Sequence, residues 1–520
     1  MNVRKLFSDV AVYGASDVAV SAVSFLLIPI YTRVLTTTDF GVFALLLTIE
    51  AGSKILLRWG LDSAFIRLYY DCPDKHARET LASSIWWFLA AVNAPLLLAG
   101  VLAAPWIGDS LLGTRAYTDT LRVFFVNTVA LGFFFVPFNV YRIEGRTGRF
   151  ATLMFLRAAG TVVLRLVLVV WFDMGVLGLV LADVILTGAV AVCLAPTVKE
   201  LLRLRFSGPM LREALGFGLP RLPHGMAHQV TALSDRWVLN AYLSADQVGV
   251  YALGATFGLS LKLFLSAFGY AWTPFAFEAM NQPAAKDMYR RVTTYVTGLL
   301  VLLATVLAAV SEDLVRLMTA PSFHAAAAVI PWIAAGVVCQ GFYQTTAVGL
   351  SITKRMAMMP MATVAAAAVS VAANLLLVPR FGIAGAAWST MCAYGTLAVV
   401  GYVLSQRVYP IRYDWAKLLT IVAAGLVAYS VAVLTFHDDR TLIARLLFRA
   451  TTASAIYLGV LAAVGVIRPG ELRTILRDRG GLSPADRKQP PVEVVDLAGD
   501  IATTPSQGEI VSPANPRKVE

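Results

Sequence analysis

Charged side chains are scarce in this sequence of 520 residues. Asp, Glu, Lys and Arg make up 14% of the chain, whereas 58% of the residues are hydrophobic and the mean hydropathy is +0.70. Soluble domains carry about 25% charged residues, because their surfaces have to face water. A chain of this length with so few charges cannot cover a water-exposed surface, so we expect lipid to solvate much of it.

Cysteines and catalytic motifs are equally sparse. The 4 cysteines stand far apart, at spacings that suit neither a metal site nor a disulfide framework. No glycine-rich loop of the phosphate-cradling type is present. The longest outer loops that we expect, 104–118 and 311–324, are too short for a catalytic domain. We therefore expect no cofactor, no metal and no ATP-hydrolysing domain. If the protein transports a molecule across the membrane, the driving force has to come from an ion gradient, from the gradient of the transported molecule or from a partner.

Long apolar runs, by contrast, are abundant. A transmembrane helix needs about 20 predominantly apolar residues. On this basis we predict an all-α integral membrane protein with about fourteen transmembrane helices. The candidate spans are 10–34, 40–66, 82–104, 119–141, 150–171, 175–196, 214–240, 247–272, 291–311, 325–349, 357–378, 383–405, 416–436 and 443–467.

The remaining Lys and Arg residues concentrate in every second loop. With the N-terminus inside, the inner loops hold the larger share, for example Arg142, Arg146 and Arg149, and the outer side holds fewer, for example Arg445 and Arg449. Cytoplasmic loops of membrane proteins carry such an excess. We therefore expect a bacterial inner (plasma) membrane protein with both termini in the cytoplasm. The net charge of +11 then indicates contact with anionic membrane lipids and not with nucleic acid.

An internal repeat organises the chain. Residues 35–45 (LTTTDFGVFAL) and 243–253 (LSADQVGVYAL) share five identical positions at an offset of 208. A shorter echo, the segment that starts at Gly175 (GVLG) and the one that starts at Gly382 (GIAG), has an offset of 207. Six predicted spans separate the copies, so both halves should have the same orientation, as in transporters built from parallel repeats.

The repeat predicts a division of the chain into two parallel six-helix lobes plus two C-terminal helices. The tail is rich in Pro, Asp, Glu and Ser, and we expect it to be cytoplasmic and largely disordered. The predicted boundaries are 1–198 for the first lobe, 199–213 for a cytoplasmic linker, 214–406 for the second lobe, 407–467 for two additional helices and 468–520 for the tail.

Three stretches resemble the polysaccharide-export branch of the multidrug/oligosaccharidyl-lipid/polysaccharide exporter superfamily. They are PIYTRVL at 29–35 with DFG at 39–41, SDRW at 234–237 with VGVYA at 248–252, and NLLLVPRFG at 374–382 with GAA at 385–387. The resemblance covers roughly residues 1–467. It implies a flippase that moves an undecaprenyl-pyrophosphate-linked glycan from the cytoplasmic to the periplasmic leaflet by alternating access. A polysaccharide polymerase and chain-length machinery are the further partners that we expect.

Several charges fall inside the predicted spans. Glu50, Lys54, Arg58 and Asp62 follow at intervals of four residues and so form one stripe along a helix. A charge at the bilayer centre costs about 2.5–3.5 kcal/mol on insertion scales, so such a stripe has to face water or protein. Two interpretations stay open. The stripe lines a transport cavity, or Glu50–Lys54 and Arg58–Asp62 are i,i+4 pairs that neutralise each other.

Bases outnumber acids among these interior charges, which suits an anionic cargo. Arginine in particular donates bidentate hydrogen bonds to phosphate. The predicted substrate-binding residues are Lys54, Arg58, Arg157, Arg165, Arg221 and Arg236, and the candidates for ion coupling are Glu50, Asp62 and Asp183. Arg236 next to Asp235 could instead be a local structural pair. Spans nine to fourteen contain almost no interior charge, so we expect the cargo chemistry in the first eight spans.

Two other classes of function compete with a flippase for lipid-linked oligosaccharides in surface polysaccharide synthesis. One is an ion-coupled multidrug exporter or an exporter of the peptidoglycan precursor, from the same superfamily. A cation exporter would need more acids than bases in its cavity. The other is a membrane polysaccharide polymerase or ligase, which would need a sizeable extramembrane region or a surface cluster of acids.

Overall fold

The computed structural model describes residues 25–465 except residues 26, 354, 356–357 and 435–440. Most of the predicted first span (10–34) and the predicted tail (468–520) lie outside the described residues. The chain divides into two compact units, Met1–Val466 and Ile467–Glu520, and the following description concerns the first. The further division into two six-helix lobes stays a prediction.

Every regular element in the described part of the chain is a helix. The elements are α2 (Ile28–Val34), α3 (Thr37–Arg58), α4 (Leu61–Asp71), α5 (Lys75–Ile107), η1 (Gly108–Leu112), α6 (Thr118–Phe133), α7 (Phe135–Ile143), α8 (Thr147–Leu166), η2 (Val167–Trp171), α9 (Gly175–Leu201), α10 (Gly208–Gly218), η3 (Leu219–Arg221), α11 (Leu222–Tyr242), α12 (Ala245–Leu259), α13 (Lys262–Ala279), α14 (Ala285–Met318), η4 (Pro321–Ala328), α15 (Ile330–Thr346), α16 (Val348–Ile352), α17 (Met359–Val408), α18 (Trp415–Leu434) and α19 (Leu442–Ala463).

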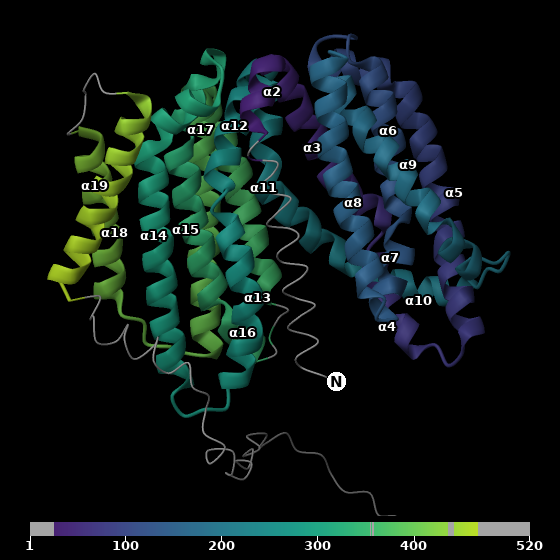
Figure 1. The fold of residues 1–520 in the computed structure, drawn as a ribbon. Helices are drawn as coiled ribbons and strands as arrows, with labels where there is room; N and C mark the ends of the chain where they lie inside the picture. Colours follow the sequence, from purple (N-terminus) through teal and green to yellow (C-terminus); the bar gives the residue numbers. More distant parts are fainter. Residues whose placement is uncertain (1–24, 26, 354, 356–357, 435–440, 466–520) are drawn as a thin grey trace, which may run out of the picture. The chain divides into compact units, whose positions relative to one another are not determined.

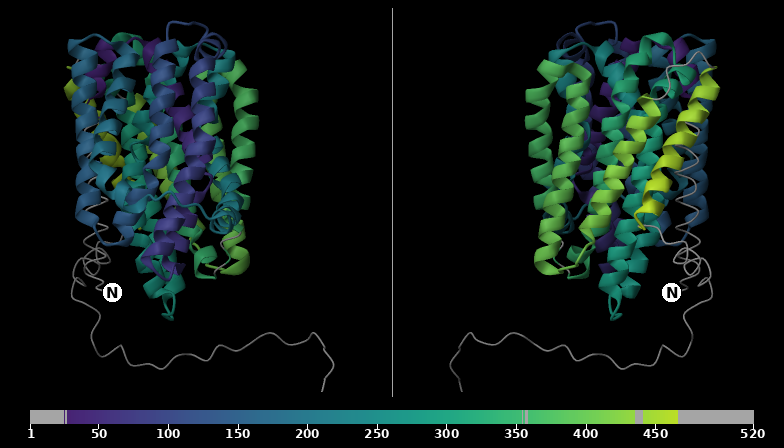
Figure 2. Two further views of the ribbon diagram at one scale, coloured as in Figure 1. Left: turned by 90° about the vertical axis from the view of Figure 1, so that its right-hand side faces the viewer. Right: turned by 90° about the vertical axis from the view of Figure 1, so that its left-hand side faces the viewer.

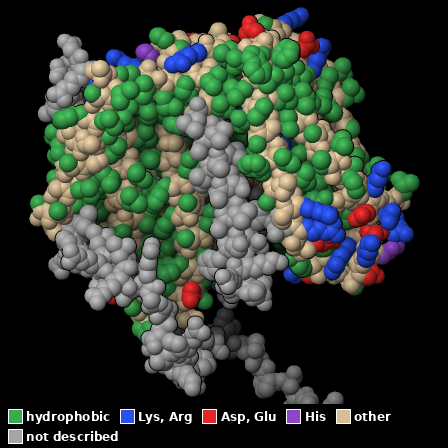
Figure 3. Space-filling model, in the orientation of Figure 1, with side chains coloured by type: hydrophobic (Ala, Val, Ile, Leu, Met, Phe, Trp, Pro, Cys, Tyr) green, Lys and Arg blue, Asp and Glu red, His purple; other side chains and the backbone are tan. Residues whose placement is uncertain are grey.

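The predicted all-α membrane fold is confirmed. Among the described residues, 10 helical segments are long and apolar enough to cross a membrane, or 11 if the bent pair of η4 and the helix after it forms one span. Hydrophobic side chains cover the flanks of these helices, whereas Lys and Arg gather around the ends of α4, α7 and α10 (Figure 3). The predicted number of fourteen spans stays a prediction, since α17 counts once and α11 is too polar to be included.

Helix α17 is a hairpin of two helices. Gly382 interrupts its 50 residues with a positive φ of 59°, and a side chain at Gly385 would collide with the carbonyl of Leu377. Residues 377 and 385 would lie about 12 Å apart in a continuous helix. Their contact therefore shows that the chain reverses at Gly382, between the segments 357–378 and 383–405 that the sequence predicted as two spans.

The helices form two groups within the first unit (Figures 1 and 2). Helices α5, α6, α8 and α9 pack on one another, and α14, α15, α17, α18 and α19 form the other group. Helix α3 packs on α6 and α9 of the first group and also on α11 and α12. Helix α11 in turn packs along the α17 hairpin. Contacts between α3 and its partners α11 and α12 therefore join the two groups.

The repeated segments meet face to face where α3 crosses α12. A side chain at Gly41 would lie 1.8 Å from the carbonyl oxygen of Ala245, and one at Gly249 would lie 2.0 Å from that of Thr37. The two contacts correspond at the repeat offset of 208. In an α-helix the carbonyl of each residue points along the helix toward the residue four places ahead. The Thr37 carbonyl thus points toward Gly41 and contacts Gly249, and the Ala245 carbonyl points toward Gly249 and contacts Gly41. The two glycines therefore lie side by side, and the two helices run in the same direction. A two-fold axis parallel to α3 and α12 that relates the two repeated segments would produce this pair of contacts.

The second echo of the repeat also has a structural counterpart. Gly175 and Gly382 both adopt positive φ angles, 53° and 59°, at the start of a helix. Three residues later, Gly178 packs against Leu168 and Gly385 against Leu377, each in the helix that precedes it. Glycine is required in both places because a Cβ would be strained or would collide. The sequence echo therefore marks two tight helical reversals of the same kind.

Polar contacts fix the N-terminal end of α3. Thr36 and Asp39 form a capping box, in which each side chain accepts a hydrogen bond from the other residue's backbone N–H. Tyr117 donates a hydrogen bond of 3.0 Å to Asp39, and burial together with this carboxylate raises the pKa of Tyr117 to about 12. Thr37 also donates a hydrogen bond to Asp246 of α12. These contacts hold α3 in place at its crossing with α12.

Candidate functional site

The four predicted stripe residues line one cavity of about 480 Å³. Glu50, Lys54 and Arg58 project from α3, Asp62 projects from α4, and α11 forms part of the remaining wall through Leu222, Gly225 and Gln229. The cavity therefore lies between α3 and α11, below the Gly41–Gly249 crossing along α3. We call it the charged cavity.

The stripe does not lie on one uninterrupted helix, although residues 37–71, which contain the expected span 40–66, are together long and apolar enough to cross a membrane. Trp59 and Gly60 both have left-handed φ angles, of 53° and 68°, and they separate α3 from α4. The Leu57 carbonyl, freed at this break, accepts a hydrogen bond of 2.9 Å from Asn93 of α5. Gly60 itself lies against Gly218, with no room for a side chain. The break explains why Arg58 and Asp62 do not form the i,i+4 pair that a helix would allow.

The charges of the cavity are only partly neutralised. Lys54 forms an ion pair with Glu50, and its side chain is 40% exposed. Arg58 has no ion-pair partner among the described residues, and its buried Nε lacks a hydrogen-bond acceptor there. Its guanidinium lies over the ring of Phe135 at 6.0 Å. Asp62 accepts a hydrogen bond from the neighbouring Ser63 backbone N–H. Arg58 is thus a cation that donates no hydrogen bond to any residue that the structure describes.

Helices α8 and α9 carry the next group of predicted residues. Arg165 donates two hydrogen bonds, of 2.7 and 3.0 Å, to the carboxylate of Asp183 and lies 5.1 Å from the centre of the Phe43 ring. Arg157 is subject to the charges of Asp183 and Glu50. It nevertheless makes no ion pair with any described residue, and its buried Nε has no acceptor among them. Arg165 is therefore paired with a carboxylate, although its own buried Nε also lacks an acceptor among the described residues, whereas Arg157 has no ion-pair partner there.

The two predicted residues before and on α11 lie apart from this group. Arg236 is buried and bound to Asp235, which also accepts a hydrogen bond from Tyr251 of α12. The guanidinium of Arg236 lies 5.9 Å from the centre of the Tyr251 ring. It does not line the charged cavity. The backbone of Arg221 belongs to η3, and its side chain lies outside the described part of the structure.

The expectation that spans nine to fourteen contain almost no interior charge is wrong. Asp313 of α14 is completely buried and accepts hydrogen bonds of 2.6 Å from Arg445 and 2.8 Å from Arg449 of α19. Arg449 is itself buried, although the sequence analysis counted both arginines among the charges of the outer side. The reason is that α14 continues to Met318, seven residues past the predicted end of its span. In the sequence, the four-residue spacing of Arg445 and Arg449 was the available indication that the two side chains lie on one face of a helix.

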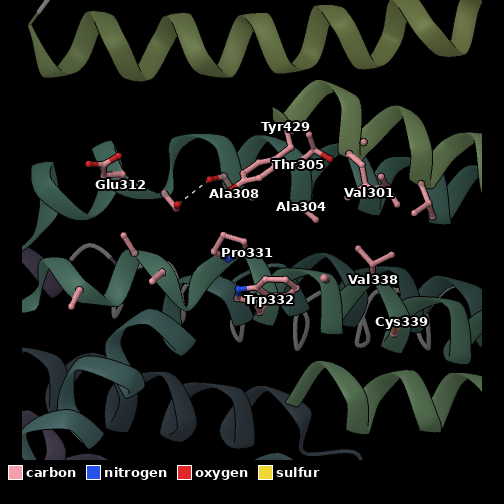
Figure 4. A pocket seen from close by; sticks show the side chains of 18 of the residues that line it. Val301, Ala304, Thr305, Ala308, Glu312, Pro331, Trp332, Val338, Cys339 and Tyr429 are labelled. Carbon is pink, nitrogen blue, oxygen red and sulfur yellow. Dashed lines mark hydrogen bonds between the residues drawn. The ribbon is translucent and has the colours of Figure 1, made fainter. Parts of the chain in front are cut away.

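A second cavity of about 710 Å³ has a different character (Figure 4). Apolar side chains from α14, α15 and α18 surround it, among them Val301, Val338 and Leu426, with Trp332 and Tyr429 on facing sides. Its polar residues include the ion pair between Glu312 and Arg316, at 2.6 Å. We call it the apolar cavity.

The fold is that of known membrane transporters. The chain aligns with the solved structure of the lipid II flippase MurJ in an inward closed conformation, with a TM-score of 0.68, 13% sequence identity and coverage of 91% of this chain and 100% of that one. An inward-facing transporter of the multidrug resistance MATE family of the MOP superfamily gives a TM-score of 0.61 at 15% identity, over 74% of this chain and 94% of that one. At these identities the likeness concerns the fold alone.

Sequence comparison identifies the family. Residues 30–328, more than half of the chain, match the family described as "Polysaccharide biosynthesis protein". A curated relative, the "Lsg locus putative protein 1" of Haemophilus influenzae, is 20% identical over 284 residues, which is 54% of this chain and 67% of that protein. The chain therefore belongs to the polysaccharide biosynthesis protein family, in the polysaccharide-export branch of the exporter superfamily that its motifs resemble. It is a multi-pass membrane exporter of that superfamily.

Proposed function

We propose that this protein is a flippase that moves a polyprenyl-pyrophosphate-linked oligosaccharide from the cytoplasmic to the periplasmic leaflet of a bacterial inner membrane, and not an enzyme. The observation that carries the proposal is the pair Arg58 and Arg157. Arg58 on α3 and Arg157 on α8 make no ion pair or hydrogen bond with any described residue, and the Nε of each is buried.

Partly buried cations without an ion-pair partner among the described residues favour an anionic cargo. Leaving a charged donor unsatisfied inside a protein costs more than about 1–3 kcal/mol, so a site retains such groups when a ligand satisfies them. The planar guanidinium donates two parallel hydrogen bonds to phosphate oxygens, which a lysine cannot do. The pyrophosphate that links a glycan to its lipid is an anion of this type. Lys54, which lines the charged cavity with Arg58 and is paired with Glu50 in this structure, is a further cation near the site.

Transport by alternating access needs a contact that can open. In this structure α3 and α12 are closed against each other at Gly41 and Gly249, while the charged cavity lies farther along α3. Opening at the glycine crossing would expose the cavity toward the other side. Glu50 and Asp183 each bind a cation already, so protonation or a coupling ion at either carboxylate would release a basic group. This is the route by which we propose ion coupling, with Asp62 as the third candidate.

The test is to replace each arginine separately in the bacterium that carries the gene. We expect Arg58→Ala and Arg157→Ala to lower the surface polysaccharide about tenfold or more, since a hydrogen bond to a charged group contributes about 1.5–3 kcal/mol. The lipid-linked intermediate should accumulate on the cytoplasmic side. Arg122→Ala is the matched control, because Arg122 is exposed and paired with Asp119. Membrane levels of all variants are compared by immunoblot.

Two results would contradict the proposal. Normal polysaccharide in both variants at normal protein levels would remove the arginines from the transport path. Accumulation of the peptidoglycan precursor, with normal surface polysaccharide, would assign the protein a different cargo. The polymerase and chain-length machinery that we propose as partners can be sought by crosslinking the functional protein in membranes.

A further inference from the structure

A separate pocket of about 590 Å³ lies where α17 ends and α18 begins. Both helices are long and apolar enough to cross a membrane. The segment that joins them, residues 409–414, therefore lies where the chain leaves the hydrocarbon and enters it again, at the depth of the lipid headgroups. The proposed transport path does not involve this pocket.

The joining segment is held in a defined conformation. The side-chain amide of Gln406 binds the backbone of Ile411 twice, because its Nε2 donates to the Ile411 carbonyl at 2.6 Å and its Oε1 accepts from the Ile411 N–H at 2.9 Å. Ile411 and Tyr413 are buried against α14, in a cluster with Tyr289. The neighbouring side chains are thus presented from a fixed backbone, as a binding site requires.

Two uncompensated positive charges line the pocket. Arg407 and Arg412 are exposed, and neither makes an ion pair with any residue that the structure describes. The adjacent acid, Asp414, is occupied by Lys417 at 3.3 Å. Helix α18 begins at Trp415, so the positive end of its dipole faces the same place. Two arginines and a helix N-terminus together form a receptor for phosphate.

An apolar surface continues from the pocket along both helices. Val403 and Trp415 belong to its lining and are exposed, by 41% and 46%. One helical turn farther from the segment, Val399 on α17 and Leu419 on α18 are exposed as well, by 62% and 67%. Residues four apart share a helix face, so the exposed apolar surface runs from the arginines toward the middle of the bilayer. A ligand with a phosphate and fatty chains matches this order.

We propose that this pocket binds an anionic phospholipid of the surrounding membrane, with the phosphate between Arg407 and Arg412 and an acyl chain along Val399 and Leu419. Anionic phospholipids bind basic pockets between transmembrane helices in this way. The site would hold the α17–α18 connection against the leaflet and is independent of the cargo.

The test measures lipid binding by the purified full-length protein with native mass spectrometry. Phosphatidylglycerol and phosphatidylcholine are titrated against the unchanged protein, against Arg407→Ala/Arg412→Ala, and against Arg380→Ala as the control. Arg380 is exposed at the opposite end of the α17 hairpin. We expect the unchanged protein and the control to prefer phosphatidylglycerol, and the double variant to lose about tenfold in affinity for this lipid only.

Equal binding of phosphatidylglycerol by all three proteins would overturn the proposal. Displacement of the lipid by millimolar inorganic phosphate would assign the pocket to free phosphate instead, which also contradicts a lipid site. A variant with Arg407→Lys and Arg412→Lys checks the geometry, and we expect it to bind more weakly than the unchanged protein and more tightly than the double alanine variant. The measurement requires no transport, so its failure leaves the proposed flippase activity untouched.

Discussion

The charged cavity and the apolar cavity differ in how their charges are satisfied. In the charged cavity, Glu50 and Lys54 pair within one helix, and Arg58 has no partner among the described residues. Near the apolar cavity, Asp313 of α14 is shared between Arg445 and Arg449, which both belong to α19. The charges that join α14 to α19 are matched by protein groups, whereas Arg58, which we propose to bind the cargo, has no ion-pair partner among the described residues. Whether a charged side chain has an ion-pair partner therefore distinguishes the structural charges from the proposed functional ones better than the number of charges in a helix does.

The first way to break this comparison is to remove Asp313. We expect Asp313→Asn to destabilise the fold by about 3–5 kcal/mol, because Arg445 and Arg449 would lose their buried counter-charge. Thermal unfolding of the purified protein in detergent measures the effect. Glu312→Ala is the control and should cost under about 1 kcal/mol, since Glu312 is half-exposed. Equal stability of the Asp313 variant and its control would remove the structural role from this cluster.

The second experiment concerns the glycine crossing between the two groups. We expect Gly249→Ala to destabilise the protein by about 1–3 kcal/mol, because the added Cβ would lie 2.0 Å from the Thr37 carbonyl and push α3 away from α12. Gly52→Ala on α3, the helix that α12 contacts, is the matched control, since its Cβ would have no neighbour within 4 Å. That substitution should be neutral or slightly stabilising. Identical melting temperatures for both variants would contradict the close contact.

A third experiment compares Arg157 and Arg165, which lie on the same helix, α8. Arg165→Ala leaves the half-buried Asp183 without its cation, and we expect a loss of about 1–2 kcal/mol in stability. Arg157→Ala removes a cation that has no partner among the described residues, and we expect unchanged or slightly higher stability together with lost export. Melting temperatures compared side by side with polysaccharide levels measure both effects. Similar destabilisation by the two substitutions would mean that Arg157 is a structural residue.

The smallest effect is expected for the pair Glu50 and Lys54. An ion pair four residues apart on a helix contributes about 0.2–0.5 kcal/mol, and the Lys54 side chain that would be replaced is partly exposed, so Lys54→Gln should change the melting temperature very little. Freed from Lys54, the Glu50 carboxylate can approach Arg157, whose charge already acts on it. We therefore expect weaker export from Lys54→Gln despite nearly unchanged stability. Full export would exclude Lys54 from the path of the cargo.

The sequence predicted the class of fold because lipid imposes a simple length and hydropathy rule on every span. The internal repeat was equally accessible, since Gly41 and Gly249 are retained for a contact that tolerates no side chain. The reversal of the chain at Gly382 agrees with the two spans predicted as 357–378 and 383–405. The end of α3 at Trp59 was missed, because no glycine or proline at that position announced a left-handed residue.

The candidate site could be predicted only in part. The four-residue spacing of Glu50, Lys54 and Arg58 indicated a common face, and these residues do line one cavity. The sequence could not tell that Arg165 binds Asp183 while Arg157 stays open, because all three lie in apolar helices with similar surroundings. The burial of Asp313 was missed for a related reason. Its partners are more than 130 residues away along the chain.

By itself, the sequence determined that this chain is a helical membrane protein with a duplicated plan and excess positive charge in its first half, because burial in lipid and helix periodicity act over a few residues at a time. Only the tertiary structure decided which charge meets which partner and where a cavity remains. Ion pairs form over a few ångströms between helices that are distant in sequence. A backbone break of two residues at Trp59 and Gly60 was enough to prevent the ion pair between Arg58 and Asp62 that was one of the two open interpretations, although the charge of Asp62 still acts on Arg58.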